Sequence, residues 1–300
     1  MNVMVTGASG FIGTHLVEAM SKDDAVDNIF ALYRRKEQIP FIPKVNPVIG
    51  DLDSLPSIKV DARIDVAVHL AGYYKTESKK LCEEINVQGT KNTVSFCKNN
   101  SIPRIIFFST INVNLKTKGR YAVSKAEAEE IVKNSGIDYM IVRPSLVYGG
   151  RVGSLGKIIG YAEKFPIFPI FGLGKAIEQP IHINELVELT LMMIKDFKPG
   201  EEIYAAGWDA IPFSMLVKTI GNCIGKKVRI MPIPAKPVYW IIKLAEKAGI
   251  HPGLSSEQVA HMSQDLAADM TQTLKLYPVK LKPFEEHIKA DLKGDLPQQS

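Results

Sequence analysis

Short apolar runs alternate with amphipathic segments along the first half of the chain. The runs are about five residues long and continuous rather than alternating, which is typical of strands buried on both faces of a parallel sheet. The segments between them repeat their apolar residues at helical spacing. The pattern predicts strands at 2–6, 28–33, 66–71, 104–109 and 139–143, and helices at 11–22, 82–99 and 120–133.

The order of these elements indicates a fold class. Strand, helix and strand in strict succession build an open, doubly wound α/β sheet with helices on both faces. Ligands in that architecture bind at the carboxyl ends of the strands. Candidate chemistry is therefore expected directly after each apolar run.

The second half of the chain has a looser pattern. Glycines and prolines interrupt it after residue 149, and a strand with a helix returns at 181–194, followed by a strand at 203–206. The expected class is α/β, a Rossmann-type doubly wound parallel sheet with a smaller mixed α/β C-terminal substrate domain. Beyond residue 206 the pattern predicts helices at 213–224, 238–248, 255–266 and 284–292, a strand at 227–230, and a frayed tail at 294–300.

Composition excludes several classes of protein. With 46% hydrophobic and 23% charged residues in 300, the chain is not mainly disordered. Its apolar runs are too short to span a bilayer, and no basic segment precedes an apolar one at the N-terminus, so neither an integral membrane span nor a signal peptide is expected. Three cysteines outside any C-x-x-C pair and six histidines without ligand spacing predict no metal site. A net charge of +5, spread along the chain, is too small for a nucleic-acid footprint, so we expect a small-molecule substrate. The few, unpaired cysteines fit the reducing cytoplasm, where we expect the protein.

A glycine-rich segment follows the first predicted strand and opens the first helix. Its sequence is Thr6-Gly-Ala-Ser-Gly-Phe-Ile-Gly13, with glycines at 7, 10 and 13. Glycine permits a tight turn and close approach of the backbone to a pyrophosphate, which the free N–H groups of a helix N-terminus then bind. The position after a buried strand favours this interpretation over glycines that serve packing alone. We therefore expect residues 1–149, with 177–206 returning to them, to bind NAD(P), and 150–176 with 207–300 to bind substrate.

Basic residues follow the second predicted strand. Tyr33-Arg34-Arg35-Lys36 lies where NAD-specific proteins usually carry an acidic residue for the ribose 2′-hydroxyl. Arginine at this place suits a 2′-phosphate. NADP(H) is thus the preferred cofactor, NAD(H) remains possible, and a merely solvated basic cluster is the alternative.

A tyrosine and a lysine lie four residues apart on the predicted helix 120–133. Positions i and i+4 share a helix face, so Lys125 lies one turn from Tyr121 and its charge favours the phenolate. A phenol with a lowered pKa is a better proton-transfer group near neutral pH. The pair alone is a weak signal, but here it follows the strand that ends in Ser109 and Thr110.

These motifs, in this order, resemble the extended short-chain dehydrogenase/reductase family, in its NAD(P)-dependent epimerase/dehydratase branch. The similarity covers residues 3 to about 190. It is carried by Thr6 to Gly13, Asp51-Leu52, His69-Leu-Ala-Gly72, Asn86-Val-Gln-Gly-Thr90, Phe108-Ser-Thr110, Tyr121-Ala-Val-Ser-Lys125, Arg143-Pro-Ser-Leu-Val-Tyr-Gly149 and Gln179-Pro-Ile-His-Ile-Asn184.

The resemblance implies roles for individual residues. Tyr121 would move the substrate's hydroxyl proton, Lys125 would also hold the nicotinamide ribose, and Thr110 would bind the substrate oxygen, with Ser109 as the alternative. Tyr73, Tyr74, Ser109, Asn112 and Tyr148 are candidates for the substrate pocket. The cofactor-binding residues implied by motif and resemblance together are Gly7, Ser9, Gly10, Phe11, Ile12, Gly13, Arg34, Arg35, Asp51, Leu52, Leu70, Ala71, Gly72, Lys125 and Pro144.

One departure from the family affects the expected function. Only ten residues separate Thr110 from Tyr121, whereas sugar-nucleotide epimerases and dehydratases generally have a longer loop there. The leading hypothesis is an NADP(H)-dependent oxidoreductase or epimerase that acts on a secondary alcohol or ketone of a nucleotide-sugar. The alternative is an NAD(P)H-binding sensor or scaffold, similar to the accessory subunit of respiratory complex I, without turnover.

Two features bear on interactions. Family members commonly dimerise through helices beside the active site, and the helices from about Cys82 and Tyr121 are the expected contact of a homodimer. The segment 237–247 is amphipathic enough to lie on a membrane. We interpret it instead as a helix that faces the core, because apolar helical faces usually bury in their own domain.

Overall fold

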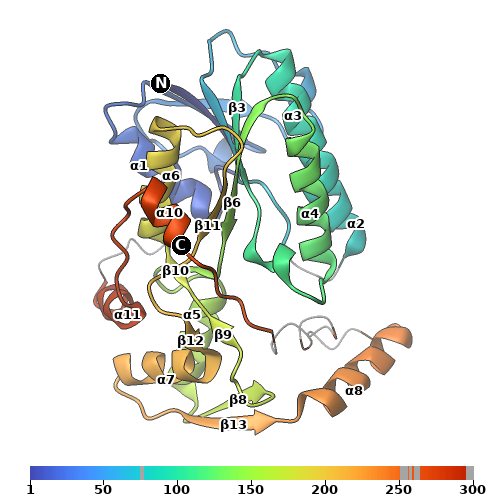
Figure 1. Ribbon diagram of the computed structural model, residues 1–300, viewed down its shortest axis with the longest axis vertical. Coiled ribbons are helices and arrows are strands. Elements are labelled where there is room, and N and C mark those ends of the chain that lie inside the picture. The colour runs from blue at the N-terminus through green and yellow to red at the C-terminus, as the bar shows by residue number, and fades with distance from the viewer. Residues whose placement is uncertain (75–77, 251–255, 257–258, 260–263, 295–300) are drawn as a thin grey trace.

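The computed structural model contains a seven-stranded, fully parallel sheet (Figure 1). It describes residues 1–74, 78–250, 256, 259 and 264–294. The strand order is β11-β6-β5-β4-β1-β2-β3: from β1 the sheet grows to one side through β2 and β3, and to the other side through β4, β5, β6 and β11. This is the order of a Rossmann-type fold and confirms the predicted class. The strands are β1 (Asn2–Thr6), β2 (Asn28–Tyr33), β3 (Val45–Ile49), β4 (Val66–His69), β5 (Arg104–Phe108), β6 (Asp138–Pro144) and β11 (Glu202–Ala205).

Helices cover both faces of this sheet. On one face α1 (Phe11–Ser21) packs beside α6 (Ile183–Lys195), and on the other α3 (Gly89–Asn99) packs beside α4 (Arg120–Lys133) (Figure 1). Neighbouring strand residues point into opposite layers, so Val3 and Val5 join the core under α1 and α6, while Met4 joins the core under α3 and α4. Helices thus bury both faces of the sheet, which explains why the apolar runs in the sequence are continuous.

The predicted helix 82–99 begins earlier and is not uniform. It runs as α2 (Lys79–Leu81), a π-helical stretch η3 (Cys82–Gln88) and α3. Within η3 the fully buried Asn86 accepts, through its backbone carbonyl, a hydrogen bond of 2.6 Å from the Thr90 hydroxyl. π-helical turns often mark functional positions, and this one aims Asn86 at the site described below.

A smaller lobe lies beyond the carboxyl edge of the sheet, built mainly from residues 150–176 and 207–250 (Figure 1). Its core is formed by residues such as Leu155, Ile159, Leu216 and Phe284. Its elements are α5 (Gly153–Lys164), β8 (Ile167–Phe171), β9 (Ile177–Glu178), β12 (Ile211–Pro212), α7 (Phe213–Cys223), β13 (Arg229–Ile233) and α8 (Ala235–Lys247). The short strands β7 (Val147–Tyr148) and β10 (Ile181–His182) pair with each other. Near the C-terminus, α10 spans Thr271–Leu276, and α11 (Phe284–Leu292) packs against α7.

Several elements were not predicted from the pattern. Strand β3 carries Pro47 and the exposed Asn46, which is tolerated because it is an edge strand. Helix α5 contains Gly156 and Gly160 and forms because one face buries Leu155 and Ile159. The short elements β8 and α10 were also missed, the strand predicted at 227–230 lies at Arg229–Ile233, and the helix predicted at 255–266 falls largely outside the described residues.

The prediction that the helix near 237–247 faces the core is wrong. Trp240, Ile241 and Leu244 of α8 are 59%, 66% and 64% exposed, and Ile242 is the helix residue that is buried. The pattern had located the apolar face correctly but not what surrounds it. Within the described residues, no helix is long and apolar enough to cross a membrane.

Candidate active site

Most of the predicted site residues meet at one edge of the sheet. Strands β6, β5, β4 and β1 are consecutive neighbours and parallel, so their carboxyl ends lie side by side. The glycine-rich segment follows β1, residues 70–72 follow β4, and Ser109 with Thr110 follow β5. Helix α4 brings Tyr121 and Lys125 to the same edge.

The glycine-rich segment forms a cradle with no space for side chains. Gly7 has φ +75°, and a Cβ there would lie 2.6 Å from the backbone nitrogen of Ala71. A Cβ on Gly13 would lie 2.1 Å from the carbonyl oxygen of Gly7. Gly10 begins α1 without a side-chain cap, so the helix N-terminus is open to an anion, and Ser9 and Gly10 are exposed. These features fit the pyrophosphate of a dinucleotide.

A buried histidine fixes the position of the cradle. His69 Nδ1 lies 2.6 Å from the Thr6 hydroxyl, and its Nε2 lies 3.0 Å from the Thr90 hydroxyl. Burial, with a smaller effect of the Lys125 charge, lowers the pKa of His69 to about 3, so the ring is neutral at physiological pH. His69 thus joins β1, β4 and α3.

The predicted adenosine side of the site is exposed. Arg34 and Arg35 follow β2 and both face solvent. Asp51 Oδ1 accepts hydrogen bonds of 2.8 Å from both the backbone N–H and the hydroxyl of Ser54, and these bonds lower the pKa of the Asp51 carboxyl. Leu52 packs against Gly89 of α3, and a Cβ added to Gly89 would lie 2.5 Å from the Cδ1 of Leu52.

Tyr121 and Thr110 meet through their side chains. Thr110 is 7% exposed and caps the 3-10 turn η4 (Ile111–Asn114), where its hydroxyl accepts a hydrogen bond of 3.3 Å from the Asn112 N–H. Desolvation raises the pKa of Tyr121 to about 12, although the neighbouring Thr110 side chain acts in the opposite direction. The hydroxyls of Thr110 and Tyr121 can therefore hold one substrate oxygen between them.

Lys125 does not have the expected effect in the protein alone. Its side chain is 3% exposed, and its Nζ lies 4.1 Å from the centre of the Phe107 ring. Burial lowers the pKa of Lys125 to about 7, against the opposing charge of Glu129. The prediction that Lys125 lowers the pKa of Tyr121 is thus not met: desolvation raises that pKa, and the side chain that acts in the opposite direction is Thr110, not Lys125.

Asn86 connects the two sides of the site and was not predicted as a site residue. Its Oδ1 accepts a hydrogen bond of 2.7 Å from the Tyr73 backbone N–H, and its Nδ2 donates bonds of 2.9 Å to the Tyr73 carbonyl and the Ser124 hydroxyl. Ser124 in turn donates to the carbonyl of Tyr121. The available sequence signal for Asn86 was its place at the start of the Asn86-Val-Gln-Gly-Thr90 motif.

The pocket candidates have different surroundings. The Tyr73 backbone is held by Asn86, Tyr74 is 71% exposed, and Asn112 lies partly buried in the turn after Thr110. Ser109 is buried, and its hydroxyl has no hydrogen-bond partner among the described residues. Tyr148 is 2% exposed and packs against the rings of His182, His287 and Phe284, so we do not retain it as a pocket residue.

The lobe holds an acidic residue with a shifted pKa. Burial raises the pKa of Glu178, in β9, to about 7. The segment after residue 263 holds this strand in place: Asp265 accepts from the Ile177 N–H at 2.8 Å, and the Gln264 side chain exchanges two bonds of 3.2 Å with the backbone of Thr117. The lobe is therefore tied to the loop that leads into Tyr121.

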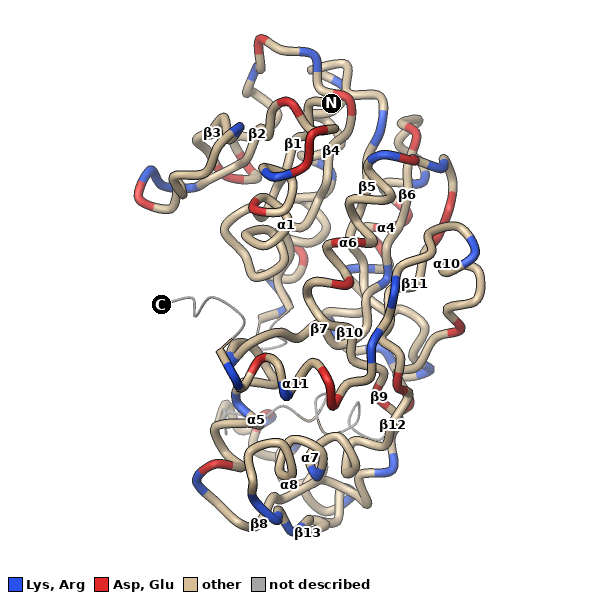
Figure 2. Tube along the Cα trace, turned by 90° about the vertical axis from the view of Figure 1, so that its left-hand side faces the viewer, with Lys and Arg blue, Asp and Glu red and all other residues tan. Residues whose placement is uncertain are grey.

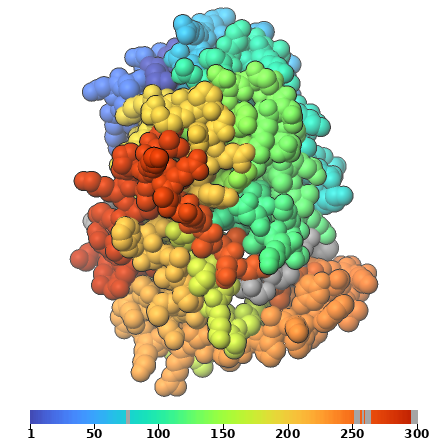
Figure 3. Space-filling view, in the orientation of Figure 1, coloured from blue at the N-terminus to red at the C-terminus, as the bar shows by residue number. Residues whose placement is uncertain are grey.

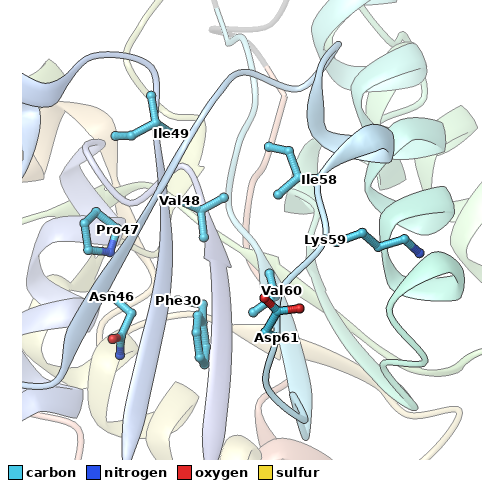
Figure 4. Close-up of a pocket in the computed structure, with 9 residues that line it drawn as sticks. All are labelled: Phe30, Asn46, Pro47, Val48, Ile49, Ile58, Lys59, Val60 and Asp61. Carbon is cyan, nitrogen blue, oxygen red and sulfur yellow. The ribbon is translucent and has the colours of Figure 1, made fainter.

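A surface groove of about 340 Å³ lies elsewhere (Figure 4). It runs along β2, β3 and residues 58–61, and contains none of the predicted site residues. Its lining includes Phe30, Val48, Ile58, Lys59, Val60 and Asp61. The site is therefore assigned from the strand ends and not from this groove.

The fold and the Thr110, Tyr121 and Lys125 arrangement define an NAD(P)-dependent enzyme of the extended short-chain dehydrogenase/reductase class. The model of the NAD dependent epimerase/dehydratase family matches residues 3–207. The chain belongs to this family.

Known proteins of this kind resemble the chain at low identity. It is 27% identical over 259 residues to the N-acetyl-alpha-D-glucosaminyl-diphospho-ditrans,octacis-undecaprenol 4-epimerase of Escherichia coli O157:H7, covering 78% of this chain and 75% of that one. It is 22% identical to the NADH dehydrogenase [ubiquinone] 1 alpha subcomplex subunit 9 of Dictyostelium discoideum, covering 95% and 82%. Among solved structures, the UDP-glucuronic acid 4-epimerase of Bacillus cereus in complex with UDP-glucuronic acid and NAD has a TM-score of 0.77 at 19% identity, covering 98% of both chains.

Proposed function

We propose that the protein is an NADP(H)-dependent oxidoreductase or epimerase that acts on a secondary alcohol or ketone of a nucleotide-sugar. The observation that carries this proposal is that Thr110, at the end of β5, lies beside the Tyr121 side chain of α4, with Lys125 one turn further along the helix. A bound nicotinamide supplies the hydride acceptor or donor. Whether the hydride returns to the same molecule decides between epimerisation and net reduction.

The chain's own residues handle the substrate oxygen and its proton. Thr110 donates a hydrogen bond to that oxygen, and Tyr121 exchanges the proton with it. Lys125 holds the nicotinamide ribose and can stabilise a Tyr121 phenolate as it forms. The high pKa of the Tyr121 phenol favours its protonated form, which suits delivery of a proton during reduction of a ketone.

The preference for NADP(H) rests on Arg34 and Arg35. Both are exposed directly after β2, where a ribose 2′-substituent lies when a dinucleotide occupies the cradle. Two guanidinium groups suit a 2′-phosphate better than a hydroxyl.

The substrate class rests on the relatives. The name of the Escherichia coli epimerase and the name of the ligand in the Bacillus cereus structure both describe a sugar joined to a diphosphate. The short loop between Thr110 and Tyr121 leaves this region more open than a longer loop would.

A scaffold or sensor without turnover is the competing proposal. It is supported by similarity to the Dictyostelium subunit over 95% of this chain. Such a protein would bind NAD(P)H in the same cradle, and the tyrosine would be idle.

Further proposals concern organisation. Residues 1–149 with 177–206 bind the cofactor, and 150–176 with 207–300 bind substrate, in the cytoplasm. The helical stretch from Cys82 and helix α4 lie side by side and can form the contact of a homodimer. Light scattering that returned a monomer at all concentrations would contradict the dimer.

A Tyr121→Phe variant tests catalysis. With NADPH or NADP⁺ and UDP-glucose or UDP-glucuronic acid as probes, the parent protein is expected to convert sugar or oxidise NADPH. The variant should lose about 10²- to 10⁴-fold in kcat while its NADPH affinity stays the same. Tyr139 lies at the amino end of β6, away from the site at the carboxyl ends of the strands. Tyr139→Phe is therefore the matched control and should keep full activity. Equal activity of Tyr121→Phe and parent would contradict a catalytic role of Tyr121.

A further inference from the structure

Helix α8 presents large apolar side chains to solvent. Trp240, Ile241 and Leu244 are each about three-fifths exposed, as is Ile250 just beyond the helix. At 3.6 residues per turn, positions 240, 241 and 244 share one face. We call these three residues the α8 apolar face. Single exposed apolar residues are ordinary, but a contiguous set on one helix marks an interaction surface.

Lysines border this face on one side. Lys236, Lys243 and Lys247 follow one another at spacings of seven and four residues, which places them along one edge of the helix. The Nζ of Lys243 lies 5.2 Å from the centre of the Trp240 ring and donates a 2.9 Å hydrogen bond to the Tyr239 hydroxyl. An apolar stripe containing tryptophan beside a row of lysines is the pattern of helices that lie in a membrane interface.

The charge of the whole lobe points to an anionic partner. Residues 150–176 and 207–250 contain eleven Lys and Arg but three Asp and Glu, whereas the remainder of the chain has 26 and 29. Blue therefore dominates red around α5, β8, β13 and α8, at the end of the molecule away from β1 to β4 (Figure 2). Figure 3 shows α8, in orange, at the lower rim of the molecule, where a flat surface can reach it.

We propose that the α8 apolar face docks on the surface of an anionic lipid bilayer. Trp240, Ile241 and Leu244 enter the boundary between headgroups and acyl chains, and the lysines contact lipid phosphates or carboxylates. A second copy of the chain fits less well, because a two-fold contact through this face brings the two sets of lysines together. This inference goes beyond the proposed function and does not rest on it.

Vesicle sedimentation with the full-length protein tests the docking. Vesicles of phosphatidylcholine with phosphatidylserine should bind the protein, and vesicles of phosphatidylcholine alone should bind it at least about tenfold more weakly. Binding should fall as salt is raised. In a Trp208→Phe background, which leaves Trp240 as the one tryptophan, its emission should shift to shorter wavelength with the anionic vesicles.

Two variants with matched controls locate the surface. Trp240→Asp/Leu244→Asp should lose vesicle binding, whereas Phe41→Asp, which changes an even more exposed apolar residue of the other region, should bind like the parent. Lys236→Gln/Lys247→Gln should weaken binding about tenfold or more, and Lys91→Gln/Lys98→Gln on α3 should not. Unchanged unfolding temperatures would show that these exposed changes leave the fold intact.

Three results would overturn the proposal. The first is absence of binding to the anionic vesicles by a folded parent protein. The second is undiminished binding by Trp240→Asp/Leu244→Asp. The third is a concentration-dependent dimer that this variant abolishes, which would assign the face to a second copy. Retained NADPH binding in the variants separates a failure of docking from a failure of the cofactor site.

Discussion

The cofactor-binding body and the C-terminal lobe use their polar and apolar residues in opposite ways. In the body, buried polar groups such as His69, Asn86 and Thr90 bond to one another, and helices enclose the apolar core residues on both faces of the sheet. In the lobe, α8 exposes its tryptophan and leucine, and desolvation raises the pKa of the half-buried Glu178. The comparison shows that the body is built to hold one rigid geometry, whereas the lobe still offers surfaces and charges to partners.

The largest expected effect comes from the cradle. Gly7 and Gly136 both have φ +75°, but a Cβ at Gly7 meets the Ala71 backbone at 2.6 Å, whereas a Cβ at Gly136 meets nothing within 4 Å. Gly7→Ala should lower the free energy of unfolding by about 2 to 5 kcal/mol and abolish NADPH binding. Gly136→Ala should cost about 1 kcal/mol and bind normally. Urea unfolding and a fluorescence titration measure both, and similar losses in the two variants would show that backbone strain, not close approach, is the reason for glycine at residue 7.

The next effect concerns the support of α4. The Arg143 guanidinium donates to both carboxylate oxygens of Glu129, at 2.9 and 2.6 Å, and to Glu202 at 2.6 Å, which joins β6 to α4 and β11. Arg143→Lys keeps the charge but loses the two-pronged bond, and should cost about 1 to 3 kcal/mol of unfolding free energy. Arg63→Lys, at an exposed side chain, is the control and should change stability by less than about 0.5 kcal/mol. A neutral Arg143→Lys would mean that this network does not hold α4 in place.

The smallest effects, counted per pH unit, are in the pH dependence of stability, where the body and the lobe should differ in sign. Burial lowers the pKa of Lys125 to about 7 from 10.5, so between these values the unfolded chain binds a proton that the folded protein has released, and stability rises with pH. Burial raises the pKa of Glu178 from 4.5 to about 7, so the folded protein keeps a proton that the unfolded chain has lost, and stability falls between pH 4.5 and 7.

Each slope is at most about 1.4 kcal/mol per pH unit. Lys125→Met should remove the rise above pH 7 and leave the fall below it, and Glu178→Gln should do the reverse. Urea unfolding of the two variants and the parent across pH 4.5 to 10 is the measurement. A variant that keeps the parent's slope in its own window would contradict the assignment of that pKa.

Sequence reasoning succeeded where local pattern and tertiary structure agree. The continuous runs at β1, β2, β4, β5 and β6 identified the sheet because both faces are buried, and the glycine motif identified the cradle because close contacts at Gly7 and Gly13 leave no space for a side chain. The site residues on β5 and α4 were placed by motif order, and Thr110 and Tyr121 do meet through their side chains.

The failures arise where long-range packing decides. Glycines inside α5 suggested a broken chain, but burial of Leu155 and Ile159 stabilises a helix there. Periodicity identified the apolar face of α8 without indicating that solvent, not the core, lies against it. The pKa of Tyr121 depends on how much protein surrounds its phenol, and no spacing of residues along the chain contains that information.

A fluorescence titration with NADPH and, separately, NADH tests the central claim most directly. The protein would first be freed of bound nucleotide, and the parent would be compared with Arg34→Ala/Arg35→Ala and Tyr121→Phe. The account predicts that NADPH binds more tightly than NADH, that the double arginine variant weakens NADPH binding by about tenfold or more with little change for NADH, and that Tyr121→Phe binds like the parent. Absence of binding to either nucleotide would contradict the assignment of the carboxyl edge as a cofactor site, and equal binding of both by parent and double variant would contradict the preference for NADP(H).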